Sequence, residues 1–291
     1  MIDPTTRTTL RLGLPKGRME ANVLQLLAEA GIRVHPTARS YRPSVSLPST
    51  EAKTMKPQNI VEMLALGRRD VGFAGADWVE EMDADLVELL DTGLDPVKVV
   101  AAAPETLVEQ GVLPSRPLVV TSEYERLARR WIATRRLDAA FARSYGATEV
   151  FPPEDADVIV DNTATGATLF ANGLVIVETL LESSTRLYAS REALDDPARR
   201  SRIEDITLLL RSVLEARRRV MIEVNAPADR LTAIVSLLPC MREATVSPLF
   251  GNAGFAVKAA VPRDQLARVI PAVKAAGGTD LVVTAINQIV P

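Results

Sequence analysis

The amino-acid sequence predicts an α/β protein of two lobes that form a cleft, followed by a smaller α+β domain. Apolar runs typical of buried strands alternate with helical patterns over residues 1–216. Residues 104–180 carry their own strand–helix series and look like an inserted lobe. Residues 217–291 have the order β-α-β-β-α-β, which is that of a ferredoxin-like domain. We therefore expect three domains, at residues 1–103 with 181–216, 104–180 and 217–291.

The composition is that of a globular protein without specialised metal or disulfide chemistry. Of 291 residues, 47% are hydrophobic and 24% are charged, and the net charge of −3 argues against a nucleic-acid partner. The single cysteine, Cys240, excludes an intrachain disulfide, and the only histidine, His35, argues against a Ser-His-Asp site. We find no signal-peptide pattern and no apolar run of ~18 residues, so we expect a cytoplasmic protein with no membrane partner.

The first strand is expected at residues 9–14, and a helix follows from about Val23 to the stop at Gly31. Lys16-Gly17-Arg18 therefore lies at a strand-to-helix junction, a favoured ligand position in an open α/β sheet. Two cations on either side of a glycine could hold a pyrophosphate. A solvated turn would suit the same three residues.

The next elements are a helix at residues 57–66, a strand at 70–75 and two further apolar runs at 86–90 and 97–103. Asp77 follows the second of these elements, at the start of another helix. It could be a helix N-cap or a ligand to a base or ribose.

The inserted lobe begins after a linker at residues 104–117. A strand from Pro117, a helix over 123–133 and a possible strand at 140–144 lead to a buried strand at 158–160. Strands at 174–178 and 185–189 and a helix at 203–217 complete the two lobes.

A loop of small residues and hydroxyls follows the strand that ends at Asp161. Thr163, Thr165 and Thr168 are hydroxyl donors, and Gly166 lets the backbone approach a ligand closely. A carboxylate at the strand end suits sugar hydroxyls or a metal ion, so the loop points to a phosphorylated sugar. An ordinary strand-to-helix connection is the alternative, because short phosphate-loop patterns have many false positives.

The last domain is expected to hold strands at 220–225, 244–249, 255–261 and 281–286, with helices at 228–238 and 263–276. A small domain of this kind at the end of an enzyme is often regulatory, which is an argument from fold analogy alone.

Four segments, taken together and in this order, resemble the long form of ATP phosphoribosyltransferase. They are Leu10–Arg18, Asp70–Asp77, Val158–Leu174 and Ala244–Leu249. The resemblance implies two periplasmic-binding-protein-like lobes of type II with a C-terminal ferredoxin-like regulatory domain. It also implies the first step of histidine biosynthesis, in which N1 of ATP displaces pyrophosphate from phosphoribosyl pyrophosphate with Mg²⁺. Feedback inhibition by histidine and assembly into dimers and hexamers are further implications.

The resemblance also implies roles for individual residues. The 5-phosphate would be held by the loop residues Ala164, Thr165, Gly166, Ala167 and Thr168. Asp161 would lie near the ribose hydroxyls, Lys16, Gly17 and Arg18 at the pyrophosphate or nucleotide phosphates, and Asp77 on the nucleotide side. Asn225 and Thr245 would meet histidine, and Glu149 is a candidate base from its place beside the cleft.

Three departures from the family pattern affect these roles. The family usually has an Arg-rich segment before the strand that begins at Asp70, and the matching stretch here is Lys56-Pro57-Gln58-Asn59. Lys56 supplies charge without a guanidinium fork. Ala164 replaces a polar residue of the loop. Asn225 replaces an acid that could pair with the effector's amino group, so we expect weaker inhibition by histidine.

Two other functions remain compatible with the residues alone. One is a type I-like phosphoribosyltransferase for another base, although such proteins carry an acidic pair where this chain has Asp161-Asn162. The other is a non-catalytic two-lobed binding or regulatory protein, which would be expected to lose the cleft cations and the phosphate loop. Lys16, Arg18 and Thr165-Gly166 are all present.

Overall fold

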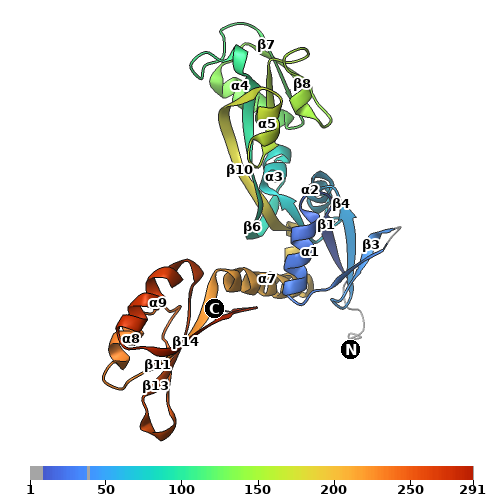
Figure 1. Ribbon diagram of the computed structural model, residues 1–291. Coiled ribbons are helices and arrows are strands. Elements are labelled where there is room, and N and C mark those ends of the chain that lie inside the picture. Colours follow the sequence, from blue (N-terminus) through green and yellow to red (C-terminus); the bar gives the residue numbers. More distant parts are fainter. Residues whose placement is uncertain (1–8, 38–39, 291) are drawn as a thin grey trace, which may run out of the picture. The chain divides into compact units, whose positions relative to one another are not determined.

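The computed structural model describes residues 9–37 and 40–290 (Figure 1). The chain divides into two compact units, one formed by residues up to 25 with 32–204 and the other by residues 26–31 with 205 onwards. The three-domain boundaries expected from the sequence remain a prediction.

The first unit is built on one eight-stranded sheet in the order β4-β1-β5-β10-β6-β9-β7-β8. Its strands are β1 (Leu10–Pro15), β4 (Thr50–Met55), β5 (Val71–Gly75), β6 (Leu86–Pro104), β7 (Leu118–Ser122), β8 (Ala139–Arg143), β9 (Val158–Thr163) and β10 (Leu174–Ser190), with β2 (Val34–Thr37) and β3 (Ser40–Val45) as a separate pair. Its helices are the first part of α1 (Glu20–Glu29), α2 (Pro57–Ala65), α3 (Ala76–Met82), α4 (Glu125–Arg135), α5 (Ala167–Ala171), α6 (Arg191–Asp195) and the first part of α7 (Pro197–Arg217), with short 3-10 turns at Glu105–Leu107 and Thr148–Val150.

Two long antiparallel strands, β6 and β10, run through both lobes of this unit. The sequence predicted two separate runs in each, and this was wrong. The polar stretch around Gly93 and Asp95 resembles a turn, but both residues have positive φ and the strand continues through them. Shifts in register along the pair absorb the irregularity. One pair of strands thus carries residues of both lobes.

Helix α7 begins six residues before its predicted start, at Pro197 instead of Ile203. The Asp196 carboxylate accepts hydrogen bonds from the backbone N–H groups of Ala198 and Arg199 at 2.9 and 3.2 Å. Proline is favoured in the first helical turn, and an aspartate before it caps the free N–H groups. This start signal lies outside the apolar pattern on which the prediction depended.

A buried carboxylate joins the helices α3 and α4. Glu81 on α3 accepts hydrogen bonds from the backbone N–H groups of Arg126 and Leu127, at 2.9 and 3.0 Å. These N–H groups belong to the first turn of α4, where the residue at the N-cap position, Tyr124, makes no side-chain cap. Glu81 therefore performs the capping that the local sequence of α4 lacks.

The second unit has the ferredoxin-like arrangement expected from the sequence. Its sheet has the order β12-β13-β11-β14, and all neighbouring strands are antiparallel. The elements are β11 (Arg219–Ala226), α8 (Leu231–Leu237), β12 (Thr245–Pro248), β13 (Phe255–Pro262), α9 (Leu266–Ala275) and β14 (Thr279–Ala285), with 3-10 turns at Phe250–Asn252 and Arg263–Gln265. Alternate residues of β11 and β13 pack against both helices, which leaves the other face of the sheet uncovered.

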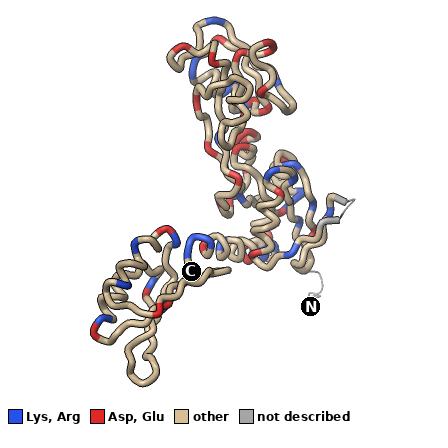
Figure 2. The backbone as a smooth tube through the Cα atoms, viewed as in Figure 1, with Lys and Arg blue, Asp and Glu red and all other residues tan. Residues whose placement is uncertain are grey.

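Charges of both signs are interspersed along the chain (Figure 2), and they nearly cancel to a net charge of −3. Among residues 9–37 and 40–290, no helix is long and apolar enough to cross a membrane.

Candidate active site

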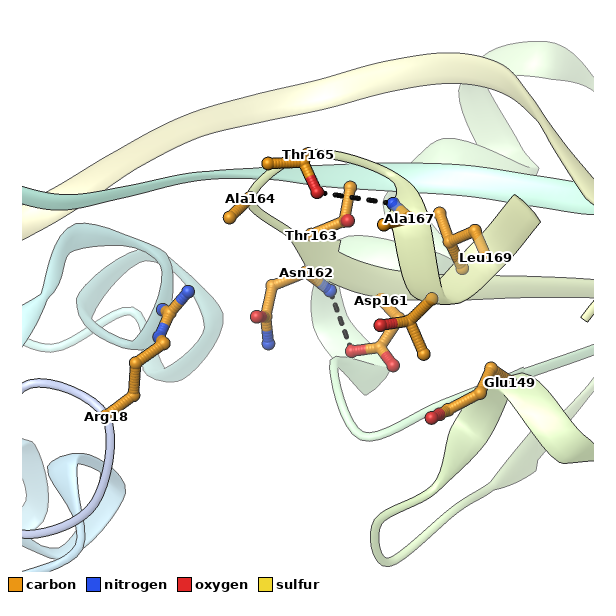
Figure 3. A pocket seen from close by; sticks show the side chains of 10 residues that line it. Arg18, Glu149, Asp161, Asn162, Thr163, Ala164, Thr165, Ala167 and Leu169 are labelled. Atoms are coloured by element: carbon orange, nitrogen blue, oxygen red, sulfur yellow. Dashed lines mark hydrogen bonds between the residues drawn. The ribbon is translucent and has the colours of Figure 1, made fainter. Parts of the chain in front are cut away.

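The loop after β9 lines a cavity of about 300 Å³ in the first unit. Gly166 has φ +80°, a conformation that favours glycine, and it turns the chain into α5. Figure 3 shows the loop residues around the cavity, with Arg18 facing them from a separate segment and Glu149 on another side. The lining residues are Arg18, Glu149, Asp161, Asn162, Thr163, Ala164, Thr165, Ala167, Thr168 and Leu169.

Two hydroxyls of the loop already hold its backbone in shape. Thr163 Oγ1 accepts a hydrogen bond from the Gly166 N–H at 2.9 Å, and Thr165 Oγ1 accepts one from the Ala167 N–H at 3.3 Å. Helix α5 has only five residues, so its dipole contributes little to binding an anion. The hydroxyls and N–H groups of the loop are thus the main groups with which it can bind an anion.

Asp161 is the carboxylate at the end of the buried part of β9. Its Oδ1 accepts a hydrogen bond from the Asn162 N–H at 2.7 Å (Figure 3). Burial raises the pKa of Asp161 to about 6, and the nearby charges of Glu149 and Glu123 act in the same direction. A cation that binds together with a ligand would therefore stabilise the ionised form of this carboxylate.

A second cavity, of about 220 Å³, shares Arg18 and Asn162 with the first. It contains Lys16, whose Nζ lies 3.3 Å from the Tyr41 hydroxyl and 4.6 Å above the centre of the Tyr41 ring. The other lining residues are Met19, Pro57, Gln58, Gly75, Asp77, Trp78, Asp95, Val97, Glu123, Ser183, Ser184 and Thr185. The two cations predicted at the strand end thus face adjoining cavities, with the positive φ of Gly17 (+89°) making the turn between them.

Asp77 is buried, and it is not the N-cap of α3, because Gly75 holds that position. Its Oδ1 accepts a hydrogen bond from the Ser183 hydroxyl at 2.7 Å. Its Oδ2 accepts one from the Tyr124 hydroxyl at 2.6 Å. Asp77 is therefore a fixed acceptor in the wall of the second cavity.

Three residues that were not predicted from the sequence complete this wall, namely Trp78, Tyr124 and Ser183. The Tyr124 ring stacks on Trp78 with ring centres 4.5 Å apart, and the Tyr124 hydroxyl accepts from Asn162 Nδ2 at 2.9 Å. Ser183 comes from the middle of β10. Ser183 lies in the polar run Glu182–Thr185 of β10, so no pattern in the sequence distinguishes it from its neighbours.

The structure does not bring every expected residue to the cavities. Lys56 is exposed at the N-cap of α2, and it is not among the lining residues, although Pro57 and Gln58 are. Gly17 and Gly166 shape the backbone without lining either cavity. The roles expected for these residues therefore depend on ligand contacts that remain a prediction.

The two residues expected to bind an effector lie in the second unit, on the uncovered face of its sheet. Asn225 pairs with Ala256 of β13, and Thr245 pairs with Lys258 of the same strand. They are therefore two strand spacings apart and offset by two residues along β13, a separation of roughly 12 Å. Asn225 Nδ2 donates a hydrogen bond to Asp280 Oδ2 at 3.0 Å, which places a carboxylate where the sequence suggested that none was available.

Comparisons with known proteins agree with this architecture. The family described as "ATP phosphoribosyltransferase" matches residues 56–212, and "HisG, C-terminal domain" matches residues 216–288. The ATP phosphoribosyltransferase of Chlorobium luteolum is 37% identical over 97% of both chains. That of Prosthecochloris aestuarii is 37% identical over 98% of this chain and 99% of its own.

A solved structure has the same fold over 70% of this chain. It is titled "ATP phosphoribosyl transferase (HisG:HisZ) complex from Thermotoga maritima". Its chain aligns over 99% of its own length with 70% of this chain, at a TM-score of 0.61 and 21% identity.

Proposed function

The chain belongs to the ATP phosphoribosyltransferase family, and we propose that its two adjoining cavities divide the two substrates between them. The enzyme transfers the 5-phosphoribosyl group of phosphoribosyl pyrophosphate to N1 of ATP, releasing pyrophosphate, in histidine biosynthesis. The family assignment sets aside transfer to another base and a purely binding role. The assignment of residues to substrates rests on the geometry of the cavities.

The 5-phosphate and ribose of phosphoribosyl pyrophosphate occupy the loop cavity in this proposal. The single observation that carries it is the presence of threonine hydroxyls, Arg18 and the Asp161 carboxylate around one space. Hydroxyls and N–H groups of a small-residue loop suit a phosphate, whereas a carboxylate suits sugar hydroxyls. Ala167 and Thr168 lie at the start of α5 and line the same space.

ATP occupies the second cavity, beside Asp77 and Trp78. Lys16 lies in this cavity and Arg18 lines both, so the phosphates of the two substrates meet these cations. Displacement at the anomeric carbon needs no enzyme nucleophile. The chain has to orient the attacking N1 and stabilise the charge that develops on the pyrophosphate, which Arg18 can do from its shared position.

The family is consistent with metal-dependent transfer, and we assign Mg²⁺ to the loop cavity. Mg²⁺ binds through one or two carboxylates together with substrate phosphates, so three protein ligands are not required. Among the described residues no group of three or more His, Cys, Asp or Glu is placed to hold a metal, but Asp161 and Glu149 line one cavity. The bound ion would neutralise charge on the pyrophosphate. Asp161 would hold the ribose hydroxyls, and Glu149 stays a candidate base.

Regulation belongs to the second unit in this proposal. Both family regions lie on one chain, which supports activity without a separate regulatory protein. Histidine would bind the uncovered sheet face near Asn225 and Thr245, and the chain would assemble as dimers or hexamers.

The experiment compares Thr165→Val and Gly166→Val with Thr134→Val, which removes an exposed hydroxyl bonded only within α4. We expect the affinity for phosphoribosyl pyrophosphate, measured by calorimetry, to decrease about tenfold or more in both loop variants, because a hydrogen bond to a charged group contributes roughly 1.5–3 kcal/mol. The unfolding midpoint of Thr165→Val and the affinity of Thr134→Val should stay near wild type. Unchanged affinity in both loop variants would show that the loop does not hold the substrate.

A further inference from the structure

We propose that Lys98, on β6, is an additional phosphate-binding residue of this enzyme, acting on the 5-phosphate of phosphoribosyl pyrophosphate. The inference rests on the proposed place of that substrate in the loop cavity. No sequence motif pointed to Lys98, because it lies within an apolar strand run at residues 97–103. The register of three neighbouring strands, β10, β6 and β9, places Lys98 beside the loop.

Lys98 stands between two specific residues in the sheet. On one side it pairs with Thr163 of β9, and on the other with Glu182 of β10, and both pairings are antiparallel. Directly opposed residues in antiparallel strands project from the same face, with Cβ atoms about 5 Å apart. The lysine therefore shares a face with Thr163, the residue whose hydroxyl holds the Gly166 N–H.

The surface around Lys98 is continuous with the loop. A cavity of about 350 Å³ is lined by Lys98, Glu182 and Ala164, together with Asp91, Pro96, Val97, Ser183, Ser184 and Arg186. Ala164 lines this cavity and the loop cavity as well. Because the side chain of Ala164 is only a methyl group, it leaves room for the Lys98 side chain to extend towards the loop.

The present partner of Lys98 is held weakly. Its Nζ lies 3.4 Å from Glu182 Oε1, and the two side chains are 54% and 76% exposed. Exposed pairs of this kind contribute little to stability. The lysine can therefore exchange Glu182 for a phosphate at small cost, by rotation about its flexible stem.

The charge of the loop cavity makes such an exchange favourable. Arg18 is the only cation among its lining residues, whereas Asp161 and Glu149 are both acidic. A sugar phosphate brings further negative charge. A second cation on the β6 side of the loop would balance it, and Lys98 is the cation that the strand register places there.

The experiment compares Lys98→Gln, Lys98→Arg and Glu182→Gln, with Lys258→Gln as the matched control. Lys258 also pairs across two antiparallel strands with a glutamate, Glu223, at 2.8 Å, and its side chain is 51% exposed. Affinities for phosphoribosyl pyrophosphate, ribose 5-phosphate and pyrophosphate are measured by calorimetry, and KM and kcat are measured without histidine. Urea unfolding reports on the fold of each variant.

We expect Lys98→Gln to weaken phosphoribosyl pyrophosphate and ribose 5-phosphate roughly tenfold, as expected from loss of one charged hydrogen bond. Pyrophosphate affinity should change less than twofold, and KM should change more than kcat. Lys98→Arg should restore most of the affinity. Glu182→Gln should keep or increase it, because it frees the lysine, and Lys258→Gln should match wild type.

Two results would overturn the proposal. In the first, Lys98→Gln binds both sugar phosphates within twofold of wild type while Thr165→Val has lost binding, so the loop site stands without Lys98. In the second, Glu182→Gln weakens binding as much as Lys98→Gln, so the ion pair serves only the fold. If Thr165→Val also binds normally, the loop assignment fails together with the role of Lys98.

Discussion

The Tyr124 hydroxyl donates a hydrogen bond to Asp77 Oδ2 at 2.6 Å, so a residue just before α4 holds a residue in the first turn of α3. The same hydroxyl accepts from Asn162 Nδ2 at 2.9 Å, which reaches the end of β9. Burial and the Asp77 charge raise the pKa of Tyr124 above its ordinary value, so it stays a proton donor at all working pH. The Tyr124 hydroxyl thus holds two lining residues in place, Asp77 of the second cavity and Asn162, which both cavities share.

Replacing Tyr124 by Phe should therefore damage both stability and ATP binding. The buried Asp77 carboxyl would lose a hydrogen-bond donor, which costs roughly 1–3 kcal/mol. We expect a lower urea midpoint and a KM for ATP raised several-fold, with a smaller change in the KM for phosphoribosyl pyrophosphate. Tyr145→Phe is the control, because Tyr145 is 88% exposed. An unchanged midpoint would show that Asp77 does not depend on this hydroxyl.

Asp161→Asn should make the protein more stable and nearly inactive. The pKa of Asp161 is raised from 3.8 to about 6, so between these values the folded chain keeps a proton that the unfolded chain releases. Stability due to this group therefore decreases as the pH rises through that window, and the cost of the buried charge is complete above it. The amide removes that cost, for a gain of roughly 3 kcal/mol at pH 8 that shrinks to roughly 1 kcal/mol at pH 4.5.

The activity of the same variant tests the role of the charge. The ionised carboxylate orients ribose hydroxyls or Mg²⁺, so kcat/KM of the wild type should rise with pH through about 6. Asp161→Asn should lose about 100-fold or more at pH 8, and the difference from wild type should shrink below pH 6, where the wild-type carboxyl is protonated. Asp155→Asn, at an exposed position nearby, should match wild type. Near-normal kcat/KM in Asp161→Asn would show that the charge of Asp161 has no role in activity and that the residue only ends a strand.

The predicted residues that line the two cavities are those that follow a strand in the sequence. Lys16, Arg18, Asp77 and the 161–168 loop each lie at a strand end, and a sheet gathers such ends along an edge. Tyr124 and Ser183 were not predicted, because their roles depend on α4 packing on α3 and on the position of β10 beside both lobes. Such tertiary contacts leave no periodic signal in a single sequence.

Glu81 allows a sharp test of how α3 supports α4. Glu81→Ala would leave two buried N–H groups without an acceptor, so we expect a loss of roughly 2 kcal/mol in the free energy of unfolding. The adjacent Glu80→Ala is the control, because Glu80 makes an exposed pair with Arg130 and should change stability by less than about 0.5 kcal/mol. Equal effects, measured by urea unfolding, would mean that the capping bonds contribute no more than a surface ion pair.

Asp280 should decide how well histidine binds. Asn225 cannot pair with the effector's ammonium group as an acid would, but its side-chain amide donates to Asp280 Oδ2 at 3.0 Å. Asp280 is the second residue of β14 and is exposed, so the ammonium group can reach its carboxylate. We expect Asp280→Asn to weaken histidine binding and inhibition about tenfold, since a hydrogen bond between charged groups is lost.

The control for this prediction is Asp264→Asn, an exposed carboxylate of the same unit in the turn before α9. Histidine affinity is measured by calorimetry and inhibition by initial rates, with the rate in the absence of histidine expected to be equal in all three proteins. Asn225→Asp would place a second carboxylate against Asp280, so like-charge repulsion should favour protonation of one of them and limit any gain in affinity. If Asp280→Asn is inhibited as strongly as wild type, the ammonium group binds elsewhere and the Asn225 side of the sheet is not the effector site.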